Sequence, residues 1–183
     1  MKVRALWAIV VSILVISIYV WFRFQNLVFG LAAIVALVHD VLVTLGITAL
    51  ASYLIGTSIG EFFLLEDLRI NLATIAAYLT LVGFSLNDTI VIFDRIREVR
   101  GKNPAITATM VNTSLNQTLG RTILTTLTVF IVVLIMYVFG GSGIHGFAWV
   151  MVIGCMAGTY SSVYIASPIL VWAMNRTVGS VKA

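Results

Sequence analysis

The stretch GFSLNDTIVIFDRIREVRGK, Gly83 to Lys102, places two polar side chains inside an otherwise apolar segment. These are Asn87 and Asp88, and Asp88 comes six residues before Asp94. In a helix that separation is about 10 Å, so Asp88 lies well inside the segment and away from its charged end. An ionised side chain at the centre of a bilayer costs roughly 2.5–3.5 kcal/mol on insertion scales. The position of Asp88 therefore needs an explanation from either function or helix packing.

The rest of the chain is apolar enough to require a bilayer as its solvent. Of 183 residues, 61% are hydrophobic and 10% are charged, whereas about a quarter are charged in soluble domains. The alternation expected of a β-barrel is absent. The sequence predicts one all-α polytopic membrane bundle over 1–183, with five transmembrane helices. Their approximate ranges are 5–22, 27–55, 70–93, 119–139 and 146–174.

The distribution of Lys and Arg predicts an orientation in the inner (plasma) membrane. Because successive breaks alternate between the two sides, one side carries seven basic residues and the other carries three. Basic loops stay in the cytoplasm, so we expect the C-terminus and the 94–118 loop there and the N-terminus outside. The seven are Arg23, Arg95, Arg97, Arg100, Lys102, Arg176 and Lys182, and the three are Lys2, Arg4 and Arg69.

Asp88 has two interpretations at this point. A carboxylate held between the cost of desolvation and a nearby cation can take up and release a proton, which makes it a proton carrier. Alternatively, it is a polar group in a static helix interface, satisfied by neighbours such as Asn87 and Ser85. Arg121 is the best candidate cation, because a helix that starts near Asn112 would bring it to a comparable depth. Arg121 also fits a side chain that snorkels to the headgroups.

Two further groups carry ionisable side chains. His39 and Asp40, in LVHDVLV, form a second buried pair that is either a proton shuttle or a structural hydrogen-bonded pair between helices. Asp94 and Arg95 belong to a charged helix end with Arg97 and Glu98, where we expect local ion pairs and a cytoplasmic anchor.

The last apolar segment carries a small-residue motif. Gly154 and Gly158 have the G-x-x-x-G spacing that lets helices approach closely, and Ser161 continues the same stripe, so helix packing is predicted. Pro168 predicts a kink further along. The two His and the single Cys lack metal-ligand spacing. With no nucleophile–base group, phosphate loop or basic–aromatic run, we expect no cofactor, no enzymatic activity and no nucleic-acid partner.

Four stretches together resemble a known family. They are VALVHDVLVTLG (35–46), GFSLNDTIVIFDRIRE (83–98), NTSLNQTLGRTILTT (112–126) and FGGSGIHGFAWVMVIGCMAGTYSSVYIASPIL (139–170). In this order they are similar to the SecF proteins of the SecD/SecF protein-export family, within the RND superfamily. The resemblance implies a half-transporter of six helices with a large exported domain between the first and second. This chain then corresponds to helices two to six, without the first helix and the exported domain.

The resemblance also implies a function. Family members act with SecD, separate or fused, and with the SecYEG channel, and YajC is a further partner. They use the proton gradient to help draw an unfolded preprotein across the lipid bilayer. Asp88 matches the acid of the family's N-D motif and Arg121 matches the arginine of its NQT-L-x-R motif, both implicated in proton passage, with Asn87 as a neighbour. Two alternatives stay open: an RND-type half-transporter for a small molecule or lipid, and a structural translocon scaffold without proton conduction.

Overall fold

The apolar runs of the sequence form long helices. The computed structural model describes residues 2–24, 26–66, 68–103 and 105–181, and no strand occurs within these ranges. Six long helices and one short helix follow one another, with a five-residue π-helix, η1, before the last. They are α1 (Lys2–Phe24), α2 (Leu27–Ser52), α3 (Ser58–Phe62), α4 (Leu72–Arg100), α5 (Ala108–Phe139), α6 (Ser142–Ser161), η1 (Ser162–Ala166) and α7 (Ser167–Val181).

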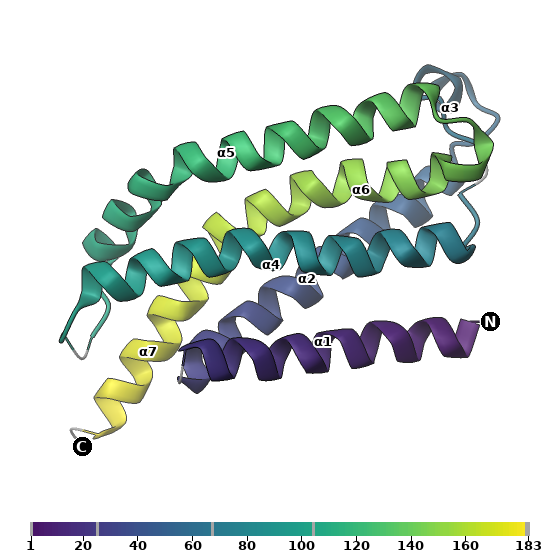
Figure 1. The fold of residues 1–183 in the computed structure, drawn as a ribbon. Coiled ribbons are helices and arrows are strands. Elements are labelled where there is room, and N and C mark those ends of the chain that lie inside the picture. Colours follow the sequence, from purple (N-terminus) through teal and green to yellow (C-terminus); the bar gives the residue numbers. More distant parts are fainter. Residues whose placement is uncertain (1, 25, 67, 104, 182–183) are drawn as a thin grey trace.

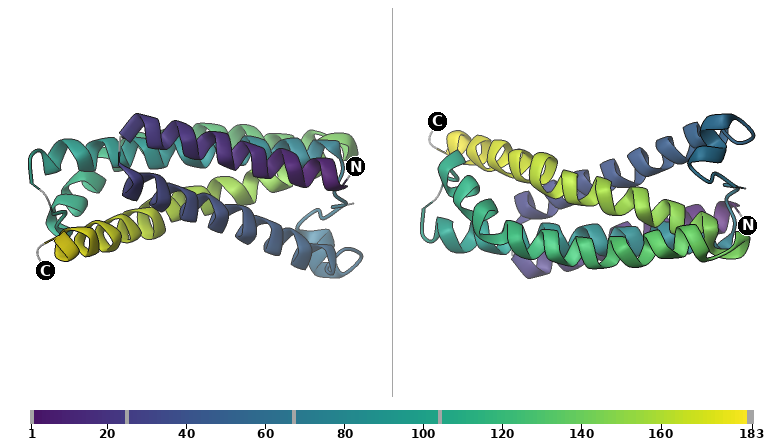
Figure 2. Two further views of the ribbon diagram at one scale, coloured as in Figure 1. Left: turned by 90° about the horizontal axis from the view of Figure 1, so that it is seen from below. Right: turned by 90° about the horizontal axis from the view of Figure 1, so that it is seen from above.

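The helices form a bundle built around α6. Helix α6 packs against α4, α5 and α2, while α1 packs against α2 and α4 (Figure 1). Figure 2 shows that α2 crosses the line formed by α6 and α7. We call the end that holds α3 and the α5–α6 turn the α3 end, and the opposite end, with the α4–α5 connection, the loop end (Figure 1).

The all-α membrane-bundle class is confirmed, with a refinement of the helix count. Four stretches are long and apolar enough to cross a bilayer: Leu27–Ser52, Leu72–Arg100, Ala108–Phe139 and Ser142–Arg176. The first predicted span, 5–22, falls in α1, whose described apolar part is the shorter helix Val10–Phe24. The last predicted span, 146–174, covers most of α6, all of η1 and the first half of α7.

The connection between α4 and α5 is much shorter than predicted. Helix α4 continues to Arg100 and ends where Gly101 adopts a positive φ of 55°. Helix α5 begins directly after Thr107, whose side chain accepts a hydrogen bond from the Met110 amide at 3.3 Å. The polar residues that indicated a loop are therefore helical, because hydropathy alone cannot distinguish a loop from a polar helix end. Arg121 consequently lies 13 residues into α5, deeper than predicted.

The predicted bend at Pro168 takes the form of the π-helix η1. Proline has no amide hydrogen, and its ring crowds the carbonyl four residues earlier, which here belongs to Tyr164 within η1. The Ser167 hydroxyl donates to the Ser162 carbonyl at 3.0 Å and satisfies one backbone acceptor of this turn. The chain therefore changes its helical geometry between α6 and α7 without leaving the helix.

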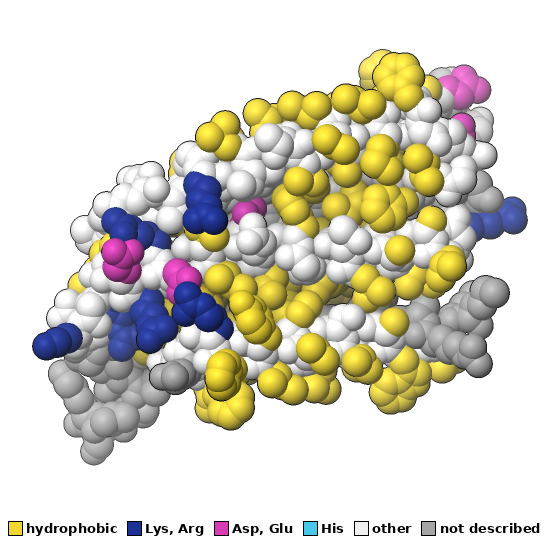
Figure 3. Space-filling model, viewed as in Figure 1, with side chains coloured by type: hydrophobic (Ala, Val, Ile, Leu, Met, Phe, Trp, Pro, Cys, Tyr) yellow, Lys and Arg dark blue, Asp and Glu magenta, His cyan; other side chains and the backbone are white. Residues whose placement is uncertain are grey.

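Charged side chains gather at the loop end, and the middle of the same face is hydrophobic (Figure 3). Arg23, at the end of α1, forms an ion pair with Asp94 of α4 at 2.6 Å. Lys182, which counts toward the predicted orientation, lies outside the described residues, as do the side chains of Lys2 and Arg4. The charged cluster and the apolar band agree with a bundle whose loop end meets an aqueous boundary.

Two glycines let α6 approach α4 closely. A Cβ atom on Gly154 would lie 2.6 Å from a methyl carbon of Leu81, and one on Gly158 would lie 3.0 Å from the Cβ of Ser85. Real Cβ atoms essentially never come closer than 3.0 Å, so a side chain at Gly154 would force Leu81 to shift, and one at Gly158 would press against Ser85. The predicted small-residue stripe thus lies at the contact between α4 and α6.

We expect Gly154→Leu to destabilise the bundle by roughly 1–3 kcal/mol, because the added side chain must displace Leu81 from a filled interface. The free energy of unfolding in detergent micelles measures the effect. Gly46→Leu is the matched control, since a Cβ at Gly46 meets nothing within 4 Å. Equal stability of the two variants would contradict the close α4–α6 contact.

Candidate functional site

Six polar side chains meet in the middle of the bundle, and we call them the polar layer. They come from four helices, and apolar clusters lie on both sides of them, one toward the loop end and one toward the α3 end. The layer contains the two carboxylates that the sequence predicted to be buried. Its members are Asp40 of α2, Ser85 and Asp88 of α4, Thr126 of α5, and Thr159 and Ser161 of α6.

Asp40 forms one half of the polar layer. Its side chain is 1% exposed, and one carboxylate oxygen accepts hydrogen bonds from the hydroxyls of Ser85 and Ser161, the latter at 2.8 Å. The other oxygen lies 3.1 Å from Nδ1 of the partly exposed His39. The predicted His39–Asp40 pair thus exists within α2, and Asp40 alone makes the contacts between helices. Ser161, predicted only to pack, is a hydrogen-bond donor to Asp40.

Asp88 forms the other half. It is 2% exposed, and its carboxylate accepts a hydrogen bond from the Thr126 hydroxyl of α5 at 3.2 Å. The hydroxyl oxygens of Thr126 and Thr159 lie 3.0 Å apart, which extends the contact to α6. Ser85, which the sequence suggested as a partner of Asp88, is bonded to Asp40 instead. Both carboxylates are therefore held by hydroxyl groups.

Helical spacing explains how the two halves are joined. Ser85 and Asp88 are three residues apart on α4, so both face into the bundle from successive turns. Gly158 faces Ser85 where α6 meets α4, and Ser161, one turn further along α6, donates to Asp40 of α2. Because α4 and α6 each contribute to both halves, a movement of one helix would alter the surroundings of both carboxylates.

Arg121 lies near Asp88 but forms no ion pair with it in the described part of the chain. The side chain is exposed on the outside of α5, and its relation to Asp88 is a coulombic attraction without direct contact. Together with Asn87, which is also exposed, it lines an open groove of about 580 Å³ between α4 and α5. Two of the predicted relay residues therefore face out of the bundle, while Asp88 faces in.

Asp94 and Arg95 lie at the charged end of the same groove. Asp94 pairs with Arg23 of α1, whereas Arg95 pairs with Glu98 and donates to the Gln117 side chain at 2.7 Å. These contacts tie α1, α4 and α5 together at the loop end. They are partly exposed, and surface ion pairs of this kind contribute about 0–1 kcal/mol each.

The sequence did not single out Thr126 or Thr159 as partners of Asp88. A threonine-rich run, TILTTLTVF (122–130), was visible in α5, but most threonines in such a run bond to their own helix backbone. Which of them turns toward Asp88 depends on the rotation of α5 against α4. That rotation is a result of packing and has no local signal in the sequence.

The layer brings carboxylate and hydroxyl oxygens within hydrogen-bond distance of one another. Carboxylates and hydroxyls both accept hydrogen bonds, and a hydroxyl also donates, so a proton can move between neighbouring oxygens. Among the described residues no group of three or more His, Cys, Asp or Glu side chains is placed to hold a metal ion. Cys155 is buried and unpaired within the described chain.

Comparison with known proteins confirms the resemblance. A family model described as "Protein export membrane protein SecD/SecF, C-terminal" matches residues 1–176. The protein translocase subunit SecF of Desulfurispirillum indicum is 44% identical over 182 residues, covering 97% of this chain and 53% of the relative. The SecF subunit of Petrotoga mobilis is 42% identical over 180 residues, covering 98% of this chain and 54% of the relative. The chain thus spans about half the length of these curated relatives.

Solved structures show the same fold. The crystal structure of SecDF from Thermus thermophilus, a translocon-associated membrane protein, has a TM-score of 0.75 and 39% identity. The match covers 94% of this chain and 22% of that one. The super-membrane-facing form of SecDF has a TM-score of 0.72 and 40% identity, covering 93% and 22%. The chain belongs to the SecD/SecF family of protein-export membrane proteins.

Proposed function

We propose that this chain is the membrane part of a SecF-type export subunit and that Asp88 carries protons across the membrane to drive a late step of preprotein translocation. The observation that carries the proposal is a buried carboxylate, midway along a membrane-spanning helix, whose bonded partner is a hydroxyl. An unpaired charge in that place is costly, so the binding of a proton changes the energy of the helix contacts around it.

The proposed cycle loads Asp88 from outside and unloads it to the cytoplasm. The cytoplasm lies at the loop end, where the basic side chains gather. Neutralisation of Asp88 removes its attraction to Arg121. The interaction that holds α4 and α5 in one arrangement is then weaker. Each proton that crosses supplies about 2.3 kcal/mol per 100 mV of membrane potential. A domain on the outer side would convert this movement into a pull on the unfolded preprotein.

The proposed partner within the membrane is SecD. Arg121 and Asn87 are polar side chains exposed on the membrane-spanning part of α4 and α5, where lipid is an unfavourable neighbour. A second half-transporter packed on this groove would cover both. The curated SecF relatives and the solved SecDF structures support SecD for this role, because the name SecDF refers to both SecD and SecF. The SecYEG channel, with YajC, completes the proposed assembly.

Asp88→Asn tests the proposal directly. Asparagine keeps the size of the side chain and its capacity to accept from Thr126, but it cannot carry a proton. In vesicles with the full-length protein, SecD and SecYEG, we expect the variant to assemble normally and to lose the stimulation of preprotein release by the proton gradient.

Asp94→Asn is the matched control, because it makes the same substitution six residues further along α4. Its partly exposed pair with Arg23 contributes about 0–1 kcal/mol, so the gradient effect should persist. If Asp88→Asn also kept the full gradient effect, the scaffold alternative would be favoured and the proton-carrier role would be wrong.

A second prediction concerns the charge of Arg121. We expect Arg121→Gln to reduce the gradient effect strongly and Arg121→Lys to retain part of it, because the coulombic attraction to Asp88 needs a cation and no bonded geometry. The same release measurement in vesicles reads out both variants. Arg97→Gln, in the last turn of α4, removes a cation from the loop end and serves as the control. A silent Arg121→Gln variant would show that this charge only anchors α5.

A further inference from the structure

Hydroxyl side chains form two rows that run from opposite ends of the bundle to the two carboxylates. Within each row the residues are four apart, so they share one face of their helix. Figure 1 shows that the second half of α2 lies toward the α3 end and the first half of α5 toward the loop end. The α2 row is Thr44, Thr48 and Ser52, which follow Asp40, and the α5 row is Ser114, Thr118, Thr122 and Thr126.

Each row contains one buried hydroxyl that makes no hydrogen bond with the described residues. These are Thr44, 0% exposed, and Thr122, 1% exposed. A threonine inside a helix usually donates to the carbonyl four residues earlier, as Thr48 and Thr118 do at 2.8 and 2.9 Å. Leaving a buried hydroxyl unpaired costs about 1–3 kcal/mol. That the same cost occurs once in each row points to a role for these hydroxyls beyond packing.

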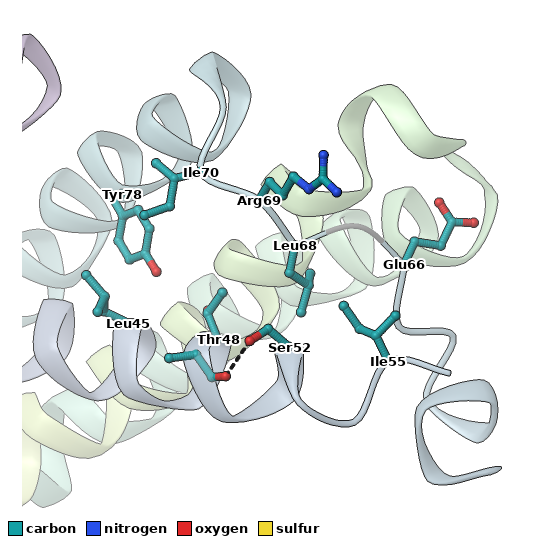
Figure 4. Close-up of a pocket in the computed structure, with 10 residues that line it drawn as sticks. Leu45, Thr48, Ser52, Ile55, Glu66, Leu68, Arg69, Ile70 and Tyr78 are labelled. Atoms are coloured by element: carbon teal, nitrogen blue, oxygen red, sulfur yellow. Dashed lines mark hydrogen bonds between the residues drawn. The ribbon is translucent and has the colours of Figure 1, made fainter. Parts of the chain in front are cut away.

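The α2 row opens into a pocket at the α3 end. The pocket has a volume of about 810 Å³, and Thr48 and Ser52 form part of its wall (Figure 4). Figure 4 shows Glu66 and Arg69 on the loop that borders the pocket. From Thr48 through Thr44 to Asp40 is eight residues, or about 12 Å along the helix. Thr44, with its unpaired hydroxyl, therefore lies along α2 between the pocket wall and Asp40.

The α5 row opens into the groove at the loop end. Thr118 lines that groove beside Gln117 and Arg121. From Thr118 through Thr122 to Thr126 is again eight residues, about 12 Å. Thr126 donates to Asp88 at 3.2 Å, so the row ends on the carboxylate. The arrangement repeats that of α2 from the other side of the membrane.

We propose that the two rows are separate half-paths for protons, the α2 row connecting the α3 end to Asp40 and the α5 row connecting the loop end to Asp88. The inference rests on the proposed function and extends it to the routes by which protons reach Asp40 and Asp88. Ser85, bonded to Asp40 and one turn from Asp88, links the two half-paths. Each hydroxyl, with intervening water, accepts a proton at a lone pair and releases its own, so a row is chemically unchanged after each passage.

Valine substitutions at the two unpaired hydroxyls test the half-paths. Thr44→Val and Thr122→Val remove a hydroxyl that makes no bond with the described residues, so neither should impair folding. In vesicles with the full-length protein and SecD, we expect each variant to lower the gradient-driven proton flux roughly five- to tenfold, the scale of one lost hydrogen bond in the path. A dye trapped inside the vesicles measures the flux.

Two controls separate this inference from the proposed function. Thr128→Val removes an exposed hydroxyl from the same helix as Thr122 and should leave the flux unchanged. Asp88→Asn should abolish the flux whichever path leads to it. If Asp88→Asn abolishes the flux while both valine variants match the wild type, the half-paths are wrong and the proton carrier stands. If Asp88→Asn has no effect on the flux, the proposed function itself fails.

Thiol labelling tests the sidedness of the two rows. In a Cys155→Ala background, which removes the only cysteine of the chain, we expect a membrane-impermeant thiol reagent to modify Thr48→Cys from one face of the vesicle membrane only. Thr118→Cys should react from the opposite face only. Reaction of both from the same face, or of neither, would overturn the proposal of two half-paths that start at opposite ends.

Discussion

Two carboxylates buried in an apolar bundle set the main constraint on this structure. Hydrocarbon offers no hydrogen bonds, so each carboxylate has to be met by donors from neighbouring helices. Serines of α4 and α6 meet Asp40, and a threonine of α5 meets Asp88. Gly154 and Gly158 of α6 contribute to this arrangement, because they allow α6 to approach α4 closely at that depth.

The polar layer also divides the core. One apolar cluster lies on its loop side, with the rings of Phe24, Phe29 and Phe93 in mutual contact, and a second lies on its α3 side around Trp149. Each cluster is packed mainly by hydrophobic side chains, and in the second Trp149 donates to the Thr48 hydroxyl at 3.2 Å and Tyr137 to the Phe63 carbonyl at 2.6 Å. The layer between them is held by hydroxyl groups that can re-pair. The polar layer thus separates two apolar clusters that belong to opposite ends of the bundle.

The sequence predicted which charged side chains are buried better than which side chains touch. The cost of charge in lipid pointed to Asp40 and Asp88, and both are buried, because that argument depends on depth alone. The pairing of Asp88 with Arg121 depended on helix rotation, and the structure places the arginine outside the bundle. The long break after Asp94 was wrong for a different reason. Hydropathy indicates where the chain leaves the lipid, whereas the caps at Gly101 and Thr107 determine where α4 ends and where α5 begins.

The π-helix at Ser162–Ala166 changes the rotation of α7 about the helix axis relative to α6. A π-turn holds about one residue more than an α-turn, and one residue of α-helix corresponds to a rotation of about 100°. The π-turn therefore offsets the face that α7 presents to the apolar cluster at the loop end by about 100° from the one that a continuous α-helix would present. Loss of the π-turn without a deletion would turn Leu170 and Met174 by about 100°, out of that cluster, whereas a one-residue deletion within η1 would restore a continuous α-helix and keep both on their present face.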